Sequence, residues 1–130
     1  MVDADRRNSK QVAVNAATIG SSPDGSHLVF QSEDNEIYGL FRLNVSDGER
    51  KRLTTGTDID PTFSPNGQWI VFTRYADQVA LWKVPFEGGE PVRLTNIPGY
   101  PLGPAVSPDG KLVAFLWSEN GSLPHCAYSA

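Results

Sequence analysis

Three short apolar runs, each following a Ser-Pro-Asp/Asn-Gly sequence, set the pattern of hydrophobic and polar positions along this chain. The runs are Leu28-Val29-Phe30, Ile70-Val71-Phe72 and Val113-Ala114-Phe115. Because neighbouring residues of a strand point to opposite faces, each run predicts a strand whose two faces are both covered by other sheets. The tetrapeptide before each run has the residues of a tight turn, in which proline presets φ and glycine accepts a positive φ. Each copy therefore predicts two strands joined by a reversal.

The copies recur with a nearly constant period, since Pro23, Pro65 and Pro108 are 42 and then 43 residues apart. In the first two periods an aromatic strand follows, at 38–45 and 79–86, and then a glycine-containing turn and a short basic strand ending in Arg-Leu-Thr. Each period thus predicts four short strands. Ten prolines, twelve glycines and the lack of helical periodicity disfavour helices. Four antiparallel strands repeated every ~40–45 residues are typical of a β-propeller blade.

The middle copy carries the full pattern: Ser-Pro-Asn-Gly, the apolar run with its phenylalanine, the aromatic strand, and Gly-Gly-Glu-Pro-Val-Arg-Leu-Thr at 88–95. This pattern resembles the TolB-like propeller repeat, a relative of the WD type, over about residues 14–118. The resemblance implies a propeller that binds protein or small ligands, often outside the bacterial cytoplasm. Related blades also serve as sensor domains of transcriptional regulators and as gating domains of serine peptidases.

We expect a single all-β domain over residues 1–130, a propeller unit of three antiparallel blades. The units are 14–54, 57–95 and 99–130, with a candidate outer strand for another blade at 6–13. The third blade would lack its own outer strand within the chain. Propellers typically have four to eight blades, so three should leave apolar faces uncovered at both ends. Two explanations stay open: a six-bladed ring of two chains that exchange N-terminal strands, or a fragment of a longer propeller.

The net charge and the composition limit the kinds of molecule that the protein is expected to bind. The net charge of −4 and the pI near 5.0 disfavour nucleic acid, because no basic field attracts a phosphate backbone. No apolar window approaches the length of a membrane span, so we expect no membrane insertion. The compartment stays open, with an extracytoplasmic location suggested by the resemblance. A lone cysteine, Cys126, cannot form an intramolecular disulfide.

Groups suited to catalysis are few, and we expect a protein that is not an enzyme and has no cofactor and no metal. His27 lies in an apolar strand and is interpreted as a packed histidine. His125 and Cys126 are adjacent, and neighbours in a strand point apart. Asp58 and Asp60 have the i, i+2 spacing of calcium ligands but lack the rest of a calcium loop.

Four residues are candidates for binding a ligand at the mouth of the central channel: Asp60, Asp58, Thr18 and Tyr100. Asp60 precedes Pro61 at the expected start of an innermost strand, and Thr18 and Gly103 occupy the equivalent places in the other copies. Aspartate is also common in turns, and Tyr100 could serve in packing. The sequence therefore predicts a non-catalytic binding or scaffolding module for a protein or small-molecule ligand. The alternatives are a gating domain of a serine peptidase and a sensor domain of a regulator.

Overall fold

The computed structural model describes residues 16–34, 37–119 and 125–129, and all regular structure in these ranges is β-strand. In this part of the chain eleven strands form three sheets, and every strand pair is antiparallel. The prediction of an all-β antiparallel fold is confirmed. The candidate outer strand at 6–13 lies outside the described residues.

The strands follow chain order within each sheet. Sheet 1 contains β1 (Ala16–Ser21), β2 (His27–Asp34), β3 (Ile37–Asn44) and β4 (Arg50–Arg52). Sheet 2 contains β5 (Thr57–Phe63), β6 (Trp69–Tyr75), β7 (Ala80–Pro85) and β8 (Val92–Arg93). Sheet 3 contains β9 (Tyr100–Val106), β10 (Val113–Ser118) and β11 (His125–Ser129).

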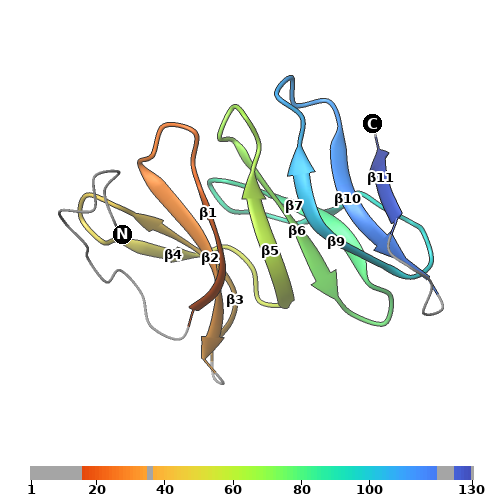
Figure 1. Cartoon of the computed structure of the whole chain (residues 1–130). Helices are drawn as coiled ribbons and strands as arrows, with labels where there is room; N and C mark the ends of the chain where they lie inside the picture. The colour runs from red at the N-terminus through yellow and green to blue at the C-terminus, as the bar shows by residue number, and fades with distance from the viewer. Residues whose placement is uncertain (1–15, 35–36, 120–124, 130) are drawn as a thin grey trace.

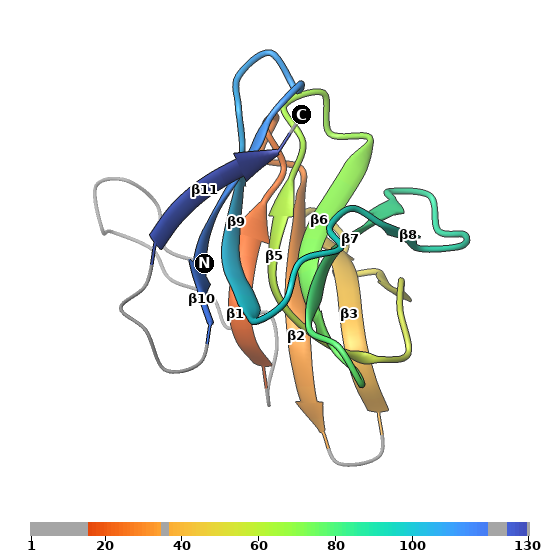
Figure 2. The same ribbon diagram turned by 90° about the vertical axis from the view of Figure 1, so that its right-hand side faces the viewer.

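The three sheets stand side by side in chain order, from sheet 1 in red to yellow to sheet 3 in blue (Figure 1). The first strand of each sheet contacts the first strand of the next, so that β1, β5 and β9 are neighbours. Figure 2 looks along the row of sheets with sheet 3 nearest the viewer. In a propeller these first strands are the ones that line the central channel.

Each Ser-Pro turn is held by the same hydrogen bonds. In the first turn, the hydroxyl of Ser22 donates to Oδ1 of Asp24 (2.7 Å), and the same oxygen accepts the amide of Ser26 (2.9 Å). The bonds recur in the turns of sheets 2 and 3, with Asn66 and Asp109 as acceptors. The glycine of every turn has a φ of 72° to 75°, as the turn chemistry predicts.

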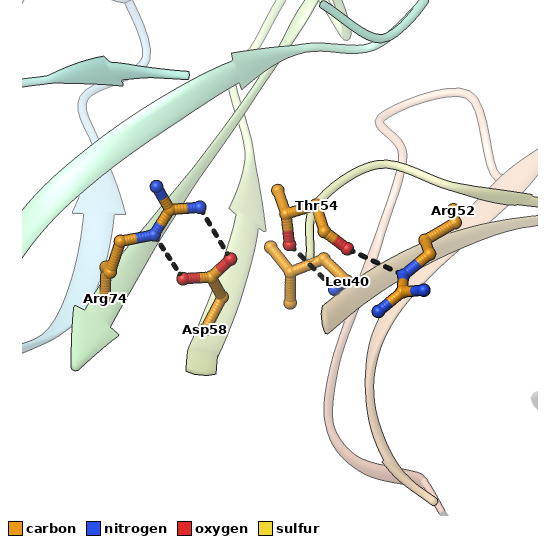
Figure 3. A network of polar contacts seen from close by, with 5 residues as sticks. All are labelled: Leu40, Arg52, Thr54, Asp58 and Arg74. Atoms are coloured by element: carbon orange, nitrogen blue, oxygen red, sulfur yellow. Dashed lines mark hydrogen bonds and ion pairs between the residues drawn. The ribbon is translucent and has the colours of Figure 1, made fainter. Parts of the chain in front are cut away.

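The Arg-Leu-Thr sequence closes the outer edge of a sheet. The hydroxyl of Thr54 accepts the amide of Leu40 (2.9 Å), and Nε of Arg52 donates to the carbonyl of Thr54 (3.1 Å; Figure 3). Thr95 and Arg93 repeat both contacts in sheet 2. The threonine thus continues the hydrogen bonding where the fourth strand ends.

The apolar core lies mainly between sheets 1 and 2, a region that we call junction 1–2. Its buried side chains are Val29, Leu40, Leu53, Phe63, Ile70, Phe72 and Val84. Leu28 and Phe30 alternate with Val29 along β2 and belong to a second cluster, on the opposite face of sheet 1. In junction 2–3, between sheets 2 and 3, the hydroxyl of Thr73 donates to the carbonyl of Pro101 (3.2 Å). Sheet 2 is therefore packed on both faces.

The first turn should make stability depend on pH. Hydrogen bonds from Ser26 and Ser22 hold the pKa of Asp24 below its ordinary value. Because this pKa is lower in the folded chain than in the unfolded one, the ionised carboxylate stabilises the fold above about pH 4, and the effect is lost as pH falls. We expect Asp24→Ala to lower the Tm at pH 7 and Asp24→Asn to preserve it, since Asn66 accepts the same bonds.

Thermal melts followed by circular dichroism check this expectation. Between about pH 4 and pH 2 the Tm of the wild-type chain should fall more steeply than that of Asp24→Asn. Equal slopes for the two proteins would show that Asp24 contributes nothing to the acid sensitivity.

Candidate functional site

A β-bulge interrupts the first strand of every sheet at the same place. The pairing register shifts between Ala17 and Ile19 in β1, between Ile59 and Thr62 in β5, and between Leu102 and Ala105 in β9. The shifts enclose the three equivalent residues Thr18, Asp60 and Gly103. Bulges bend a strand and re-aim its side chains, and they are frequent beside functional sites.

Asp60 and Gly103 adopt the same left-handed backbone, with φ of 52° and 59°. Aspartate tolerates this region better than most residues that carry a Cβ. Among the residues that the structure describes, Asp60 is the one non-glycine residue with a positive φ. The geometry of the bulge is therefore kept even where an acidic side chain replaces glycine.

The structure brings Thr18 and Asp60 together across the gap between β1 and β5. The amide of Asp60 donates to the hydroxyl of Thr18 (3.2 Å), and that hydroxyl donates to Oε1 of Gln31 (2.9 Å). Within the described ranges, the half-buried carboxylate of Asp60 has no hydrogen-bond or ion-pair partner. Asp60 is the fourth residue of β5, so it lies within the strand instead of at its start. Among the described residues, the arrangement therefore leaves the carboxylate of Asp60 on a first strand without a polar partner.

Asp58 is separated from Asp60 by this bulge and has a different environment. Its side chain is buried and forms a double contact with Arg74, Nε to Oδ1 at 2.7 Å and Nη2 to Oδ2 at 3.0 Å (Figure 3). The contact with Asp58 raises the pKa of Arg74. The guanidinium also lies over the ring of Trp82, 4.8 Å from its centroid. Asp58 therefore holds the start of β5 against β6.

The other sequence candidates are placed apart from Asp60. Tyr100 is 51% exposed at the start of β9 and lines a hollow of about 320 Å³ with Asp77, Gly99 and others. The ring of His27 packs edge-on against Phe86, 4.9 Å between centroids, as the interpretation of a packed histidine requires. The side chains of His125 and Cys126 lie outside the described part of the chain.

Metal-binding clusters and membrane-spanning helices are both absent from the described residues. No group of three or more His, Cys, Asp or Glu side chains there could hold a metal ion. The same ranges contain no helix long and apolar enough to cross a membrane.

Sequence reasoning missed a cavity of about 190 Å³ in junction 2–3, lined by Trp69, Lys83, Val106 and Lys111 among others. The signal was present in the repeat: Val106 stands where the second copy has Phe63. The alternation of residues along a strand predicts which face of the sheet a side chain lies on, but not which sheet packs against that face. Only the strand register of the structure shows that Phe63 and Val106 both point into a junction.

The ion pair of Asp58 offers a direct test of the first-strand geometry. We expect Arg74→Met to lower the free energy of unfolding by about 2 kcal/mol, because it leaves a buried carboxylate uncompensated while Arg74 itself is partly exposed. Combining it with Asp58→Asn should cost less than the sum of the two single changes. Urea denaturation measures all three variants, and additive losses would contradict a direct pair.

A family model described as TolB beta propeller domain matches residues 3–128 of this chain. Among curated relatives, the uncharacterized protein Atu1656 of Agrobacterium fabrum is 29% identical over 109 residues, which cover 82% of this chain and 37% of that protein. The chain thus spans well under half the length of this relative.

Solved structures show the same fold. The structure of putative TolB from Agrobacterium tumefaciens matches with a TM-score of 0.81 and 23% identity over 90% of this chain and 47% of that one. TolB from Acinetobacter baumannii matches with a TM-score of 0.76 and 25% identity over 86% of this chain and 29% of that one. Both matched proteins are about twice as long as this chain or longer.

Proposed function

Because the chain belongs to the TolB β-propeller family, we propose that it is a non-catalytic binding or scaffolding module that forms a six-bladed ring with a second copy of itself. The observation that carries this proposal is the exposure of two large apolar residues at opposite ends of the row of sheets. Ile19 is 63% exposed in sheet 1, and Leu116 is 53% exposed in sheet 3.

The repeat shows what covers these positions elsewhere in the chain. Ile19 is equivalent to Pro61 and Pro104, which are both buried. Leu116 is equivalent to Thr73, which is buried and bonded to the next sheet through Pro101. Sheet 1 therefore presents the kind of face that receives a preceding sheet, and sheet 3 the kind that receives a following one. Two copies placed head to tail would cover both faces at once.

The length of the matched structure is compatible with either source of the remaining blades. This chain covers 47% of the putative TolB of Agrobacterium tumefaciens, so the rest of such a length would come from a second copy or from a longer parent chain. We further propose that residues 6–13 give sheet 3 of the partner its fourth strand, since they lie one period before β4. The competing proposal is that the remaining blades belong to a longer parent chain. The complete propeller would then be a gating domain of a peptidase or a sensor domain of a regulator.

Within the ring, the carboxylate of Asp60 and the hydroxyl of Thr18 are our candidates for ligand contact along the channel, with Tyr100 at the rim. A protein or small-molecule ligand that presents a cationic group would complement the unpaired carboxylate. Asp58 would support this site by holding β5 in place. We also propose an extracytoplasmic location, on the family resemblance, with no nucleic acid as a partner and no insertion into a membrane.

Ring closure predicts a dimer. Light scattering after size exclusion should give the wild-type chain twice its 14.2 kDa mass. Leu116→Asp and Ile19→Asp should each give the mass of a single chain with an unchanged circular-dichroism spectrum, because a charge cannot be buried unpaired in the new junction. Val92→Asp is the matched control, since Val92 is 47% exposed on the outer strand β8 and should leave the dimer intact. A folded wild-type monomer at every concentration would favour the longer parent chain.

The channel site is tested with a short lysine-containing peptide as probe. We expect Asp60→Asn to weaken its binding about tenfold in calorimetric titrations, the loss of one charge-assisted contact of about 1.5 kcal/mol. Asparagine tolerates the left-handed backbone, so the fold should persist. Glu49→Gln removes the same charge from an exposed turn and should change the affinity little. An equal loss of affinity in Asp60→Asn and Glu49→Gln would mean that peptide binding depends on the net charge of the protein and not on Asp60.

A further inference from the structure

The two ends of the row of sheets have different surfaces. One end carries the Ser-Pro turns. We call the other the tyrosine end, where β2, β6 and β10 finish (toward the lower side of Figure 1). Every exposed tyrosine of the described residues belongs to it: Tyr38 at the start of β3, Tyr75 at the end of β6 and Tyr100 at the start of β9. Each of the three sheets thus contributes one exposed ring to the same end.

These three rings serve no contact within the described part of the chain. Their side chains have no hydrogen bond and no ring or cation contact there. Tryptophans of the same sheets are engaged instead. The ring centroid of Trp82 lies 4.8 Å from the guanidinium of Arg74, and the indole of Trp117 donates to the carbonyl of Pro98 (2.7 Å). Exposed tyrosines without such contacts are the residues most enriched in protein interfaces.

One hollow opens at the tyrosine end of each junction, and the two are nearly equal in size. Hollow 1–2, between sheets 1 and 2, has a volume of about 330 Å³, and hollow 2–3, between sheets 2 and 3, about 320 Å³. Gly56 and Gly99, which immediately precede β5 and β9, line them at equivalent places. A Cβ at Gly99 would collide with the carbonyl oxygen of Ser118. Each hollow is therefore a recurring feature of the junction, bounded by described residues of two neighbouring sheets.

Each hollow places a carboxylate beside a tyrosine. Glu33 is the cross-strand partner of Tyr38, so their side chains lie on one face of sheet 1, and both residues line hollow 1–2. In hollow 2–3, Asp77 and Glu119 line the same space as Tyr100. Neither hollow is lined by a lysine or an arginine of the described residues. A carboxylate next to an aromatic face is the chemistry that binds a cationic side chain.

The arginines near the hollows do not neutralise these carboxylates. Arg74 is bound by the buried carboxylate at the start of β5, and Arg93 donates to Oε1 of Gln78 (2.6 Å). Glu33 and Asp77 are exposed, and neither has an ion pair within the described ranges. The tyrosine end therefore offers two negatively charged hollows to a partner.

We propose that the tyrosine end binds an extended segment of a partner polypeptide that carries two arginine side chains, one for each hollow. Each guanidinium would contact a carboxylate and lie against a tyrosine ring, a combination that suits arginine better than lysine. Tyr75, on the sheet between the hollows, would pack against the linking residues. This proposal rests on the proposed binding function and names a class of partner for it. It uses a surface other than Asp60 and does not depend on ring closure.

Peptides with two arginines test the surface. The probes are capped peptides whose arginines are separated by about two to eight glycine and serine residues, which span roughly 7 to 28 Å when extended. Calorimetric titration should give the highest affinity at one spacer length, at least about tenfold above that of a peptide with one arginine. Replacing both arginines by citrulline, which is neutral and of the same shape, should abolish this gain. An affinity that does not depend on spacer length would overturn binding at two hollows.

Substitutions assign the peptide to the hollows. We expect Asp77→Asn and Glu33→Gln each to weaken binding of the best peptide about fivefold, the loss of one exposed charge pair. Tyr100→Leu should weaken it about threefold and Tyr100→Phe should not, because the ring face makes the cation–π contact. Glu90→Gln is the matched control, since it removes the same charge from the exposed turn between β7 and β8. Equal losses in the control and the hollow variants, or no loss in the hollow variants, would refute the proposal.

Asp60→Asn separates this surface from the channel site, and it should leave the affinity of the two-arginine peptide unchanged. A loss in Asp60→Asn with none in Asp77→Asn would place the peptide in the channel and overturn the present proposal while supporting the channel site. If no two-arginine peptide binds, the tyrosine end is refuted, whereas ring closure is still decided by the mass of the chain in solution. Binding by a monomeric chain would support the tyrosine end and contradict ring closure.

Discussion

The fold depends on one constraint: a four-stranded sheet with apolar residues on both faces cannot bury both of them alone. Val29 and Phe30 are neighbours in β2, yet each belongs to a different apolar cluster. Every sheet therefore needs a sheet on either side, as a propeller provides. Sheet 2 has both neighbours within the chain, and it contributes most of the fully buried side chains, including Phe72, Ile70, Leu81 and Val84. Among the described strands, sheets 1 and 3 each contact one other sheet, and each exposes a large apolar residue, Ile19 or Leu116.

The parts of this fold that could be predicted from sequence are those with local causes. The turn at Ser22 forms because a short acceptor at Asp24 or Asn66 can reach the next amides within the same few residues. The Arg-Leu-Thr ending recurs because Thr54 and Thr95 complete the bonding of the strand beside them. Because the pattern is repeated, each copy forms the same kind of sheet, and the sheets pack against one another in the same way.

The candidate site was less predictable, because it depends on a departure from regular strand geometry. On an ideal strand, residues two apart share a face, so Asp58 and Asp60 would lie together. The bulge at Asp60 breaks this relation: the carboxylate of Asp58 turns to Arg74, whereas that of Asp60 has no polar partner among the described residues. The pairing of Asp58 with Arg74 could not be inferred from their separation in the sequence, because the two residues come together only when β5 pairs with β6.

Differences among the copies carry more functional information than their similarities. Residues common to all copies, such as the turn glycines, serve the backbone and would be needed in any propeller. Phe63 and Val106 occupy one position in two junctions, and the smaller Val106 lines a cavity of about 190 Å³ beside Trp69 and Lys83. Asp60 likewise replaces a glycine at the bulge and adds a charge where the backbone needs none. Where a repeat must keep its packing, a substitution that weakens packing or adds a charge has a cost for stability, and such positions are the ones to test first for binding.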